Sequence, residues 1–155
     1  MSGPLDSLEL GRLTDRRPPF KYSALGRVSF SDTDAQGVVY YGRYLPYFDN
    51  ARNEYHRHLG QPHVEGAEPV MRAVSVEYRA PARFDDLIEV FVRLARIGRT
   101  SMTYECAAYR LPDELLLVTA TQTAVLVDVE HRRPVEIPEA IRAPLREFEG
   151  SDLIE

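Results

Sequence analysis

Two acids, Asp32 and Asp34, stand two residues apart just before a turn that contains Gly37. A strand-like segment precedes them, and a long amphipathic segment follows and ends at Gly60. The start of a helix carries unpaired backbone N–H groups and a partial positive charge. A carboxylate beside such donors suits chemistry at a carbonyl carbon, because negative charge then develops on the carbonyl oxygen. An acid that only caps the helix explains the same residue types equally well.

The acids lie between a strand predicted over residues 22–30 and a helix predicted to begin near Tyr44. Pro46 falls in the first turn of this helix, where its missing N–H removes no hydrogen bond. Gly60 is well placed to end the helix. Apolar residues recur at helical spacing and form one stripe: Tyr44, Phe48, Ala51, Tyr55 and Leu59. A helix about 25 Å long with one apolar stripe is expected to lie against a broad surface such as a sheet.

The chain after residue 69 alternates apolar and polar residues and predicts four strands. They cover residues 70–79, residues 87–95, a segment that contains Met102–Ala108, and residues 115–129. Short turns between them indicate hairpins. Residues 138–148 predict a short helix that Pro144 would interrupt. This order predicts an α+β fold with an antiparallel sheet packed on one helix, and it argues against a doubly wound dinucleotide fold.

The bulk properties indicate one ordinary domain of 155 residues. We expect a mobile leader over residues 1–20, the domain over residues 21–149 and a tail over residues 150–155. A formal net charge of −5 argues against general nucleic-acid binding. A single cysteine, Cys106, excludes an internal disulfide framework and a cysteine-rich zinc site. No apolar run reaches the length of a membrane span and no signal-peptide pattern is present, so a cytoplasmic protein without membrane insertion is expected.

The segment around the two acids is a long and specific motif. Residues 32–40 read Asp-Thr-Asp-Ala-Gln-Gly-Val-Val-Tyr, and related patterns follow at residues 44–45, 51–54, 76–86 and 133–138. Together these segments closely resemble the 4-hydroxybenzoyl-CoA thioesterase family of hot-dog-fold acyl-CoA thioesterases. The resemblance covers residues 22–148. It implies a hot-dog fold, in which an antiparallel sheet wraps around one long central helix.

The resemblance also implies a reaction and its residues. An acyl-CoA and water would give a carboxylic acid and free CoA, without a metal or redox cofactor. Asp34 matches the catalytic carboxylate, the backbone N–H of Tyr41 matches the donor that polarises the thioester carbonyl, and Gly37 matches a loop position close to the ligand. Many relatives carry histidine where this chain has Tyr41, so a side-chain role there is absent or changed. Whether the acid attacks the carbonyl or activates water stays open.

Substrate binding is expected from the loop, the helix and the turns: Val38, Val39, Tyr40, Glu54, Arg99, Ser101 and Arg133. Among these, Arg99 and Arg133 resemble positions that contact the phosphates of coenzyme A in the family. Grooves of the family lie between two subunits, so the resemblance implies a homodimer or homotetramer. Acyl-CoA is the only other expected partner.

Several alternatives accompany these assignments. Asp32 could be the working acid, although a capping or turn-forming role suits it better. Glu54 could act from the helix, although an ion pair with Arg57 is the simpler interpretation. His56 and His58 point to different sides of a helix, which is poor geometry for a metal. Solvated roles are expected for the loop histidines His63 and His131, and a packing role for Cys106. Another hot-dog enzyme, such as an acyl-carrier-protein thioesterase or a hydratase or dehydratase, and a non-catalytic acyl-CoA-binding module are the rival functions.

Overall fold

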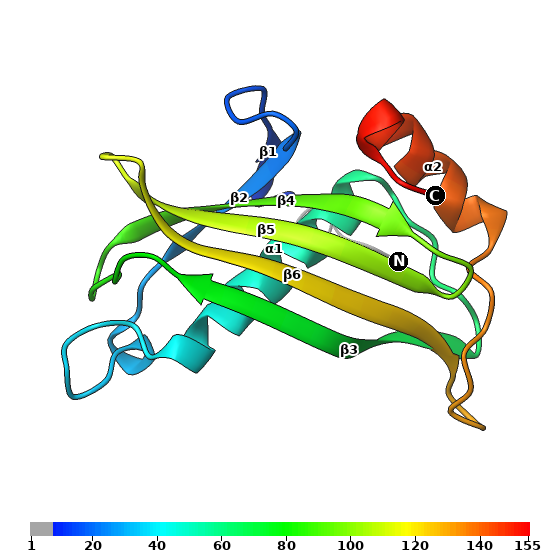
Figure 1. Cartoon of the computed structure of the whole chain (residues 1–155), viewed down its shortest axis with the longest axis horizontal. Helices are drawn as coiled ribbons and strands as arrows, with labels where there is room; N and C mark the ends of the chain where they lie inside the picture. Colours follow the sequence, from blue (N-terminus) through cyan, green and yellow to red (C-terminus); the bar gives the residue numbers. More distant parts are fainter. Residues whose placement is uncertain (1–7) are drawn as a thin grey trace.

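A curved antiparallel sheet wraps around one long helix (Figure 1). The structure is a computed structural model that describes residues 8–155. The six strands lie in the order β1-β2-β4-β5-β6-β3. Their bounds are Gly11–Leu13 (β1), Tyr22–Arg27 (β2), Ala67–Tyr78 (β3), Leu87–Ile97 (β4), Ser101–Leu111 (β5) and Leu115–Asp128 (β6). The helices are Tyr44–His58 (α1) and Glu139–Glu149 (α2), with short 3-10 turns at Phe30–Asp32, Tyr41–Arg43 and Gly150–Asp152. The predicted hot-dog architecture is confirmed.

Helix α1 lies against the inner face of the sheet because its apolar stripe is buried there. Tyr44, Phe48, Ala51 and Tyr55 are all buried in the core. On the facing side, alternate residues of β4 are buried in the same core: Ile88, Val90, Val92 and Leu94. The apolar face of the strand, which repeats every two residues, therefore packs against the apolar face of the helix, which repeats about every four, as the sequence pattern predicts. The helix ends as expected, with Gly60 at a positive φ of 62°.

The N-terminal part of the chain adds a strand that the sequence analysis did not anticipate. Strand β1 pairs with β2 in antiparallel register, with Gly11 opposite Ala24. Arg12 and Arg16 then cross to β4, where both bind the fully buried carboxylate of Glu89. A strand of three residues is too short to show a periodicity in the sequence, so the sequence alone does not predict it. The predicted leader over residues 1–20 must therefore be shortened, and residues 1–7 lie outside the described part of the chain.

The C-terminal part is also joined to the sheet. Ile154, in the predicted tail over residues 150–155, exchanges backbone hydrogen bonds with Ala95 and Ile97 of β4. Helix α2 runs through Pro144 without ending there. Its apolar residues, including the buried Leu145, pack on the core, and this burial outweighs the one hydrogen bond that the proline removes. The predicted interruption at Pro144 is wrong. Between residues 8 and 155, no helix has the length and apolarity needed to cross a membrane.

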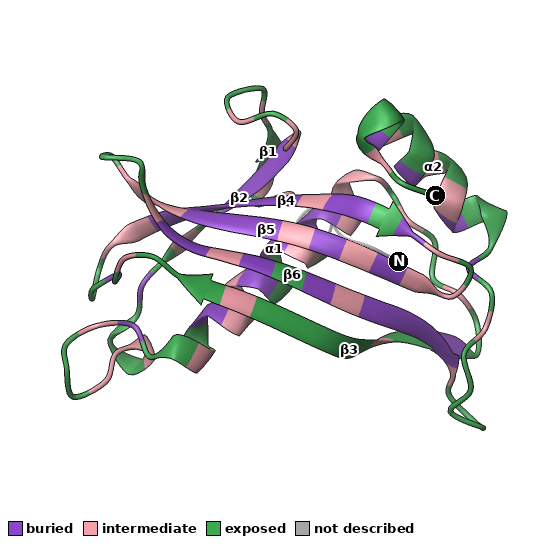
Figure 2. Cartoon of the chain, in the orientation of Figure 1, coloured by how far each residue is buried: buried purple, intermediate pink, exposed green. Residues whose placement is uncertain are grey.

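Strand β3 is a long edge of the sheet with apolar side chains in solvent. It pairs with β6 on one side only. Met71, Val74 and Tyr78 on this strand are 40%, 42% and 49% exposed. In Figure 2 most of β3 is coloured as exposed, whereas neighbouring β6 is mostly buried and β5 is coloured as buried or intermediate. An open edge of twelve residues that carries apolar side chains is a surface on which another strand can pair.

Candidate active site

Asp34 stands in a tight loop that folds back on itself. Its backbone N–H donates to the carbonyl of Val38 at 3.0 Å, and its own carbonyl accepts from the N–H of Gly37 at 2.9 Å. Gly37 has a φ of 76°, a conformation that favours glycine. The carboxylate of Asp34 accepts one hydrogen bond, from the N–H of Gln36 at 2.9 Å, and the residue is half-buried. The acid is therefore held in place while remaining accessible.

Asp32 forms the base of the same loop. Its carboxylate accepts hydrogen bonds from the N–H of Ser29 at 2.9 Å and from the hydroxyl of Tyr47, and Arg43 lies 4.0 Å away. Burial and the bond to Asp32 raise the pKa of Tyr47, so this hydroxyl keeps its proton and donates. The backbone carbonyl of Asp32 also accepts from the N–H of Tyr40 at 2.9 Å. These contacts give Asp32 the turn-forming role that the sequence analysis favoured.

Tyr41 begins the short turn that leads into α1. As the first residue of this turn, it has no acceptor for its backbone N–H within the turn. Its carbonyl accepts a hydrogen bond of 2.8 Å from the hydroxyl of Tyr78 on β3. Val39, two residues earlier, is buried, and its N–H donates to the carbonyl of Ala82 at 2.8 Å. Both contacts follow the acid in the chain and hold this end of the loop to Tyr78 and to the β3–β4 connection, with the Tyr40 and Tyr41 rings exposed. Sequence reasoning missed Tyr78 because its contact joins residues 37 positions apart.

Glu54 faces a different part of the molecule. The residue is 4% exposed and accepts hydrogen bonds from the N–H of Leu10, at 2.9 Å, and from the guanidinium of Arg57. Leu10 belongs to the N-terminal segment that precedes β1. The ion pair with Arg57 is the interpretation that the sequence analysis favoured. His58, one turn further along α1, pairs with Glu9 at 2.8 Å.

Three of the residues expected to bind the substrate, Arg99, Ser101 and Arg133, lie at the end of the sheet that is far from Asp34. Ser101 and Arg99 lie at the β4–β5 turn, and Arg133 lies in the turn after β6 (Figure 1). The Asp34 loop contacts Ala82 instead, just before the start of β4. Strand β4 has 11 residues between these two ends, which corresponds to about 33 Å. One chain alone therefore does not bring Arg99 or Arg133 to Asp34.

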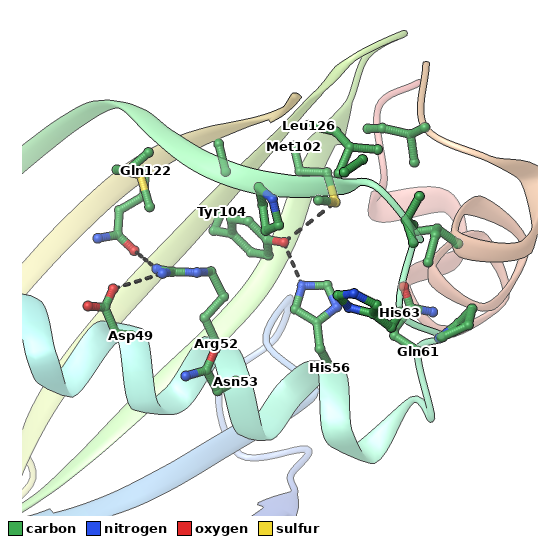
Figure 3. Close-up of a pocket in the computed structure, with 18 of the residues that line it drawn as sticks. Asp49, Arg52, Asn53, His56, Gln61, His63, Met102, Tyr104, Gln122 and Leu126 are labelled. Atoms are coloured by element: carbon green, nitrogen blue, oxygen red, sulfur yellow. Dashed lines mark hydrogen bonds and ion pairs between the residues drawn. The ribbon is translucent and has the colours of Figure 1, made fainter. Parts of the chain in front are cut away.

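A cavity of about 730 Å³ lies beside α1, between the helix and strands β3, β5 and β6 (Figure 3). On the helix side it is lined by Leu45, Asp49, Arg52, Asn53 and His56. Arg52 donates to Asp49 at 2.8 Å and to the buried amide oxygen of Gln122 at 2.7 Å. The spacing of the lining residues is helical, so this second stripe could have been found from the sequence. Two of these lining residues, Asp49 and Arg52, are charged, so the search for apolar residues at helical spacing does not include them.

His56 and the hydroxyl of Tyr104 form the polar contact at one end of this cavity, at 2.5 Å. Burial, and to a smaller extent the positive charge of Arg52, lowers the pKa of His56 to about 4. His56 is therefore neutral at pH 7. His63 and Gln61 reach the same end of the cavity from the loop after α1 (Figure 3). His63 is exposed, in line with the solvated role predicted for it, and it also lines the cavity.

Cysteine and metal chemistry receive no support as parts of the site. Cys106 is buried, and burial raises the pKa of its thiol to about 12, which fits the predicted packing role. In the part of the chain that the structure describes, no three His, Cys, Asp or Glu side chains are grouped in a way that could hold a metal ion.

The chain is similar in sequence and in fold to known thioesterases. Residues 28–145 match the family model of the thioesterase-like superfamily. This chain belongs to that superfamily. The match includes the Asp34 loop, α1, and strands β3 to β6. The predicted family and the predicted class, a thioester hydrolase, are confirmed.

Individual members of the superfamily support the assignment. The acyl-CoA thioester hydrolase YbgC of Escherichia coli O6:H1 is 34% identical over 125 residues, which cover 78% of this chain and 92% of that protein. A probable thioesterase from Bartonella henselae has a solved structure with 31% identity and a TM-score of 0.68, covering 75% of this chain and 96% of that one. A 4-hydroxybenzoyl-CoA thioesterase solved with 4-hydroxybenzoyl-CoA aligns with a TM-score of 0.73, covering 79% and 96% of the two chains. Its identity is 21%, so it shows the fold alone.

Proposed function

We propose that this protein hydrolyses acyl-CoA thioesters, with Asp34 as its catalytic carboxylate. The observation that carries the proposal is the hydrogen-bonded loop, which presents the accessible carboxylate of Asp34 a few residues before the N–H of Tyr41, at the start of the turn into α1. The relatives named acyl-CoA thioester hydrolase support the choice of thioester. Gly37, Val38, Val39 and Tyr40 form the segment between the two groups, in contact with the substrate at the thioester.

The reaction follows from where charge develops. When the thioester carbonyl is attacked, its oxygen becomes negative, and a fixed N–H at Tyr41 stabilises that charge most in the transition state. Asp34 either attacks the carbonyl carbon, giving a mixed anhydride that water then opens, or removes a proton from the attacking water. In both routes the carbon–sulfur bond breaks, the thiol of CoA leaves with a proton, and a carboxylic acid remains. Neither route requires a metal or redox cofactor.

A second copy of the chain is part of the proposed site. Two copies related by a two-fold axis would pair their open β3 edges in antiparallel fashion. The Asp34 end of one subunit would then lie beside the opposite end of the other, where Arg99, Ser101 and Arg133 are found. This pairing would also cover the apolar side chains of β3 and the open side of the cavity. The protein is therefore proposed to act as a homodimer, or as a homotetramer of two such dimers.

The cellular setting follows from the same chemistry. Coenzyme A thioesters and an unpaired thiol at Cys106 fit the reducing cytoplasm.

Release of free thiol from a panel of acyl-CoAs tests the proposal. The panel should include short aliphatic, long aliphatic and aromatic acyl groups, because the acyl group is not fixed by the loop. We expect at least one to be hydrolysed, and Asp34→Asn to abolish that hydrolysis. Tight binding of acyl-CoA without thiol release would identify a binding module instead. If thiol is released only from acyl thioesters of acyl-carrier protein, then that protein, and not CoA, is the carrier of the substrate.

A further inference from the structure

The chain has four histidines, and one of them is unengaged within residues 8–155. His56, His58 and His131 each contact a tyrosine hydroxyl or a carboxylate. His63, in the loop between α1 and β3, is exposed, and its ring forms no hydrogen bond or ion pair with residues 8–155. An imidazole gains and loses a proton near neutral pH, so an unengaged one suits proton transfer.

Thioester hydrolysis needs a proton for the departing sulfur. An alkyl thiol such as that of cysteine has a pKa of about 8.5, so the sulfur of CoA leaves more readily when a proton is supplied. From Ser31 to Arg43, the chain around Asp34 contains no histidine, lysine or cysteine. A hydrogen bond with Tyr41 raises the pKa of Tyr40, so this hydroxyl is a poorer proton donor than an ordinary tyrosine. Apart from Asp34 itself, the segment holds no side chain suited to the transfer.

His63 and the Asp34 loop lie at opposite ends of α1 in one chain. The turn at Tyr41 precedes the helix, and the loop that carries His63 follows it. With 15 residues, α1 is about 22 Å long. His63 lies beside His56, near the C-terminal end of the helix (Figure 3). A chain therefore does not bring its own His63 to its own Asp34.

Strand β3 connects these two regions across the proposed pairing of two chains. It begins at Ala67, shortly after His63, and it ends at Tyr78, whose hydroxyl donates to the carbonyl of Tyr41. Antiparallel pairing of two β3 edges places the start of each strand beside the end of the other. His63 lines the cavity between α1 and the sheet, and Tyr41 leads into α1, so both lie on the helix side of the sheet. The partner's His63 would then lie beside Tyr41.

The same end of each chain carries a cation proposed to bind CoA. The carbonyl of Gly66 accepts from the N–H of Val129 at 3.0 Å, and the N–H of Asp128 donates to the carbonyl of Arg133 at 2.8 Å. His63 therefore shares this end of the chain with Arg133. The sulfur of an acyl-CoA lies between the thioester carbonyl and the rest of CoA. A proton donor from the CoA-binding end of the partner would thus approach the thioester from its sulfur side.

We propose that His63 of the partner subunit donates the proton to the sulfur of the departing CoA, while Asp34 and the N–H of Tyr41 act on the carbonyl. As the carbon–sulfur bond breaks, the imidazolium gives its proton to the sulfur, and CoA leaves as a thiol. The water that completes hydrolysis gives its oxygen and one hydrogen to the acyl carbon. Its other hydrogen returns to the imidazole as a proton, directly or through Asp34. The inference rests on the proposed function and adds a catalytic residue from the second chain.

A change of leaving group tests the proton transfer. His63→Gln keeps a polar side chain in the loop but cannot supply the proton. We expect its kcat on an acyl-CoA to fall at least about tenfold, with KM and melting temperature nearly unchanged. On the same acyl group carried by 4-nitrothiophenol, which leaves as a thiolate, kcat/KM should stay near the wild-type value. Glu65→Gln, an exposed change in the same loop, is the control and should match the wild type on both substrates.

Mixed subunits test the origin of the histidine. Asp34→Asn and His63→Gln chains with different tags are co-expressed in equal amounts, and recovery of both chains on either tag verifies that they assemble together. In a mixed dimer, one site carries both changes and the other carries neither. Random assembly should therefore restore about a quarter of the wild-type activity, above the mean of the two separate variants. If both residues served the same site from one chain, mixing would give only that mean.

The results separate this inference from the proposed function. Wild-type kcat in His63→Gln would overturn the inference and leave Asp34 in its role. An equal loss on the CoA and nitrothiophenol thioesters, or no gain when the chains are mixed, would do the same. If the wild type hydrolyses no acyl-CoA, or if Asp34→Asn stays active, the proposed function falls and the inference with it.

Discussion

The hydroxyl of Tyr78 donates a 2.8 Å hydrogen bond to the backbone carbonyl of Tyr41. Tyr78 ends the open edge strand β3, and Tyr41 begins the turn whose N–H is proposed to bind the thioester oxygen. The Tyr78 ring also lies against the rings of Tyr41 and Tyr44, with centroids 6.4 and 5.9 Å apart. The edge on which a second subunit is proposed to pair therefore contacts the residue that carries the proposed oxyanion donor, through the peptide that follows this donor.

Removal of this hydroxyl should affect catalysis more than binding. Tyr78→Phe keeps the ring contacts and loses only the hydrogen bond to the Tyr41 carbonyl, in the peptide next to the one that carries the Tyr41 N–H. We expect kcat to fall about tenfold, within the range for a weakened oxyanion donor, while KM and the melting temperature change little. Tyr109→Phe is the control, because the Tyr109 ring on β5 packs against Phe91 and Arg17. A rise in KM at constant kcat would place Tyr78 in binding instead.

Arg99 and Arg133, the cations proposed to bind coenzyme A, should lower the KM for acyl-CoA. Replacing Arg99 or Arg133 by alanine removes a cation that is proposed to bind a CoA phosphate. KM for acyl-CoA should rise about tenfold, near 1.4 kcal/mol, with little change in kcat, and the effect should shrink with added salt. Arg132→Ala is the matched control, because Arg132 is adjacent and exposed and pairs with Glu68. Equal KM values for all three variants and the wild type would make these arginines ordinary surface charge.

The open edge of β3 predicts the assembly state. Val74→Glu would place a charge on the edge that is proposed to pair with its copy, and burial of that charge is unfavourable. We expect light scattering to show a dimer or tetramer for the wild type and a monomer with much lower activity for the variant. Val129→Glu adds the same charge to an exposed position after β6 and should leave assembly unchanged. A fully active wild-type monomer at micromolar concentration would contradict the two-subunit site.

How much of this could be predicted from the sequence depends on the range of each interaction. Helix α1 and strands β3 to β6 are long and periodic, and the Asp34 loop carries a long motif, so both were recognised. Strand β1 was missed because its support comes from Glu89, more than 70 residues away, through Arg12 and Arg16. Tyr78 and the polar end of the cavity were missed for the same reason. Their partners meet only when the sheet closes around α1.

The contact between Glu89 and the N-terminal arginines makes stability depend on pH. Burial alone would raise the pKa of Glu89, but hydrogen bonds from Arg16, Ser23 and Arg12 lower it below its usual value. A carboxyl with a lowered pKa contributes stability above the pKa of the unfolded chain, about 4.3, and loses it as the pH falls through the lower folded value. We expect Glu89→Gln to reduce the free energy of unfolding by about 1–3 kcal/mol at pH 7, and the difference from wild type to shrink below about pH 4.

Denaturant unfolding at several pH values checks this prediction. Glu105→Gln is the control, because Glu105 is half-exposed and forms a 2.9 Å ion pair with Arg93. Pairs of that kind contribute at most about 1 kcal/mol. A Glu89→Gln variant as stable as the wild type at pH 7 would show that the N-terminal arginines do not anchor the segment through this acid.

The turnover of Asp34→Asn on an acyl-CoA that the wild type hydrolyses tests the central claim most directly. Asparagine keeps the shape of the side chain and its acceptor for the N–H of Gln36, but it removes the carboxylate. The account predicts that kcat falls by a factor of at least ~10², the typical cost of losing a nucleophile or general base, with KM and melting temperature nearly unchanged. Glu54→Gln, whose carboxylate is engaged by Leu10 and Arg57, should retain most of its kcat. If Asp34→Asn keeps more than about a tenth of the wild-type kcat, the assignment of Asp34 is contradicted.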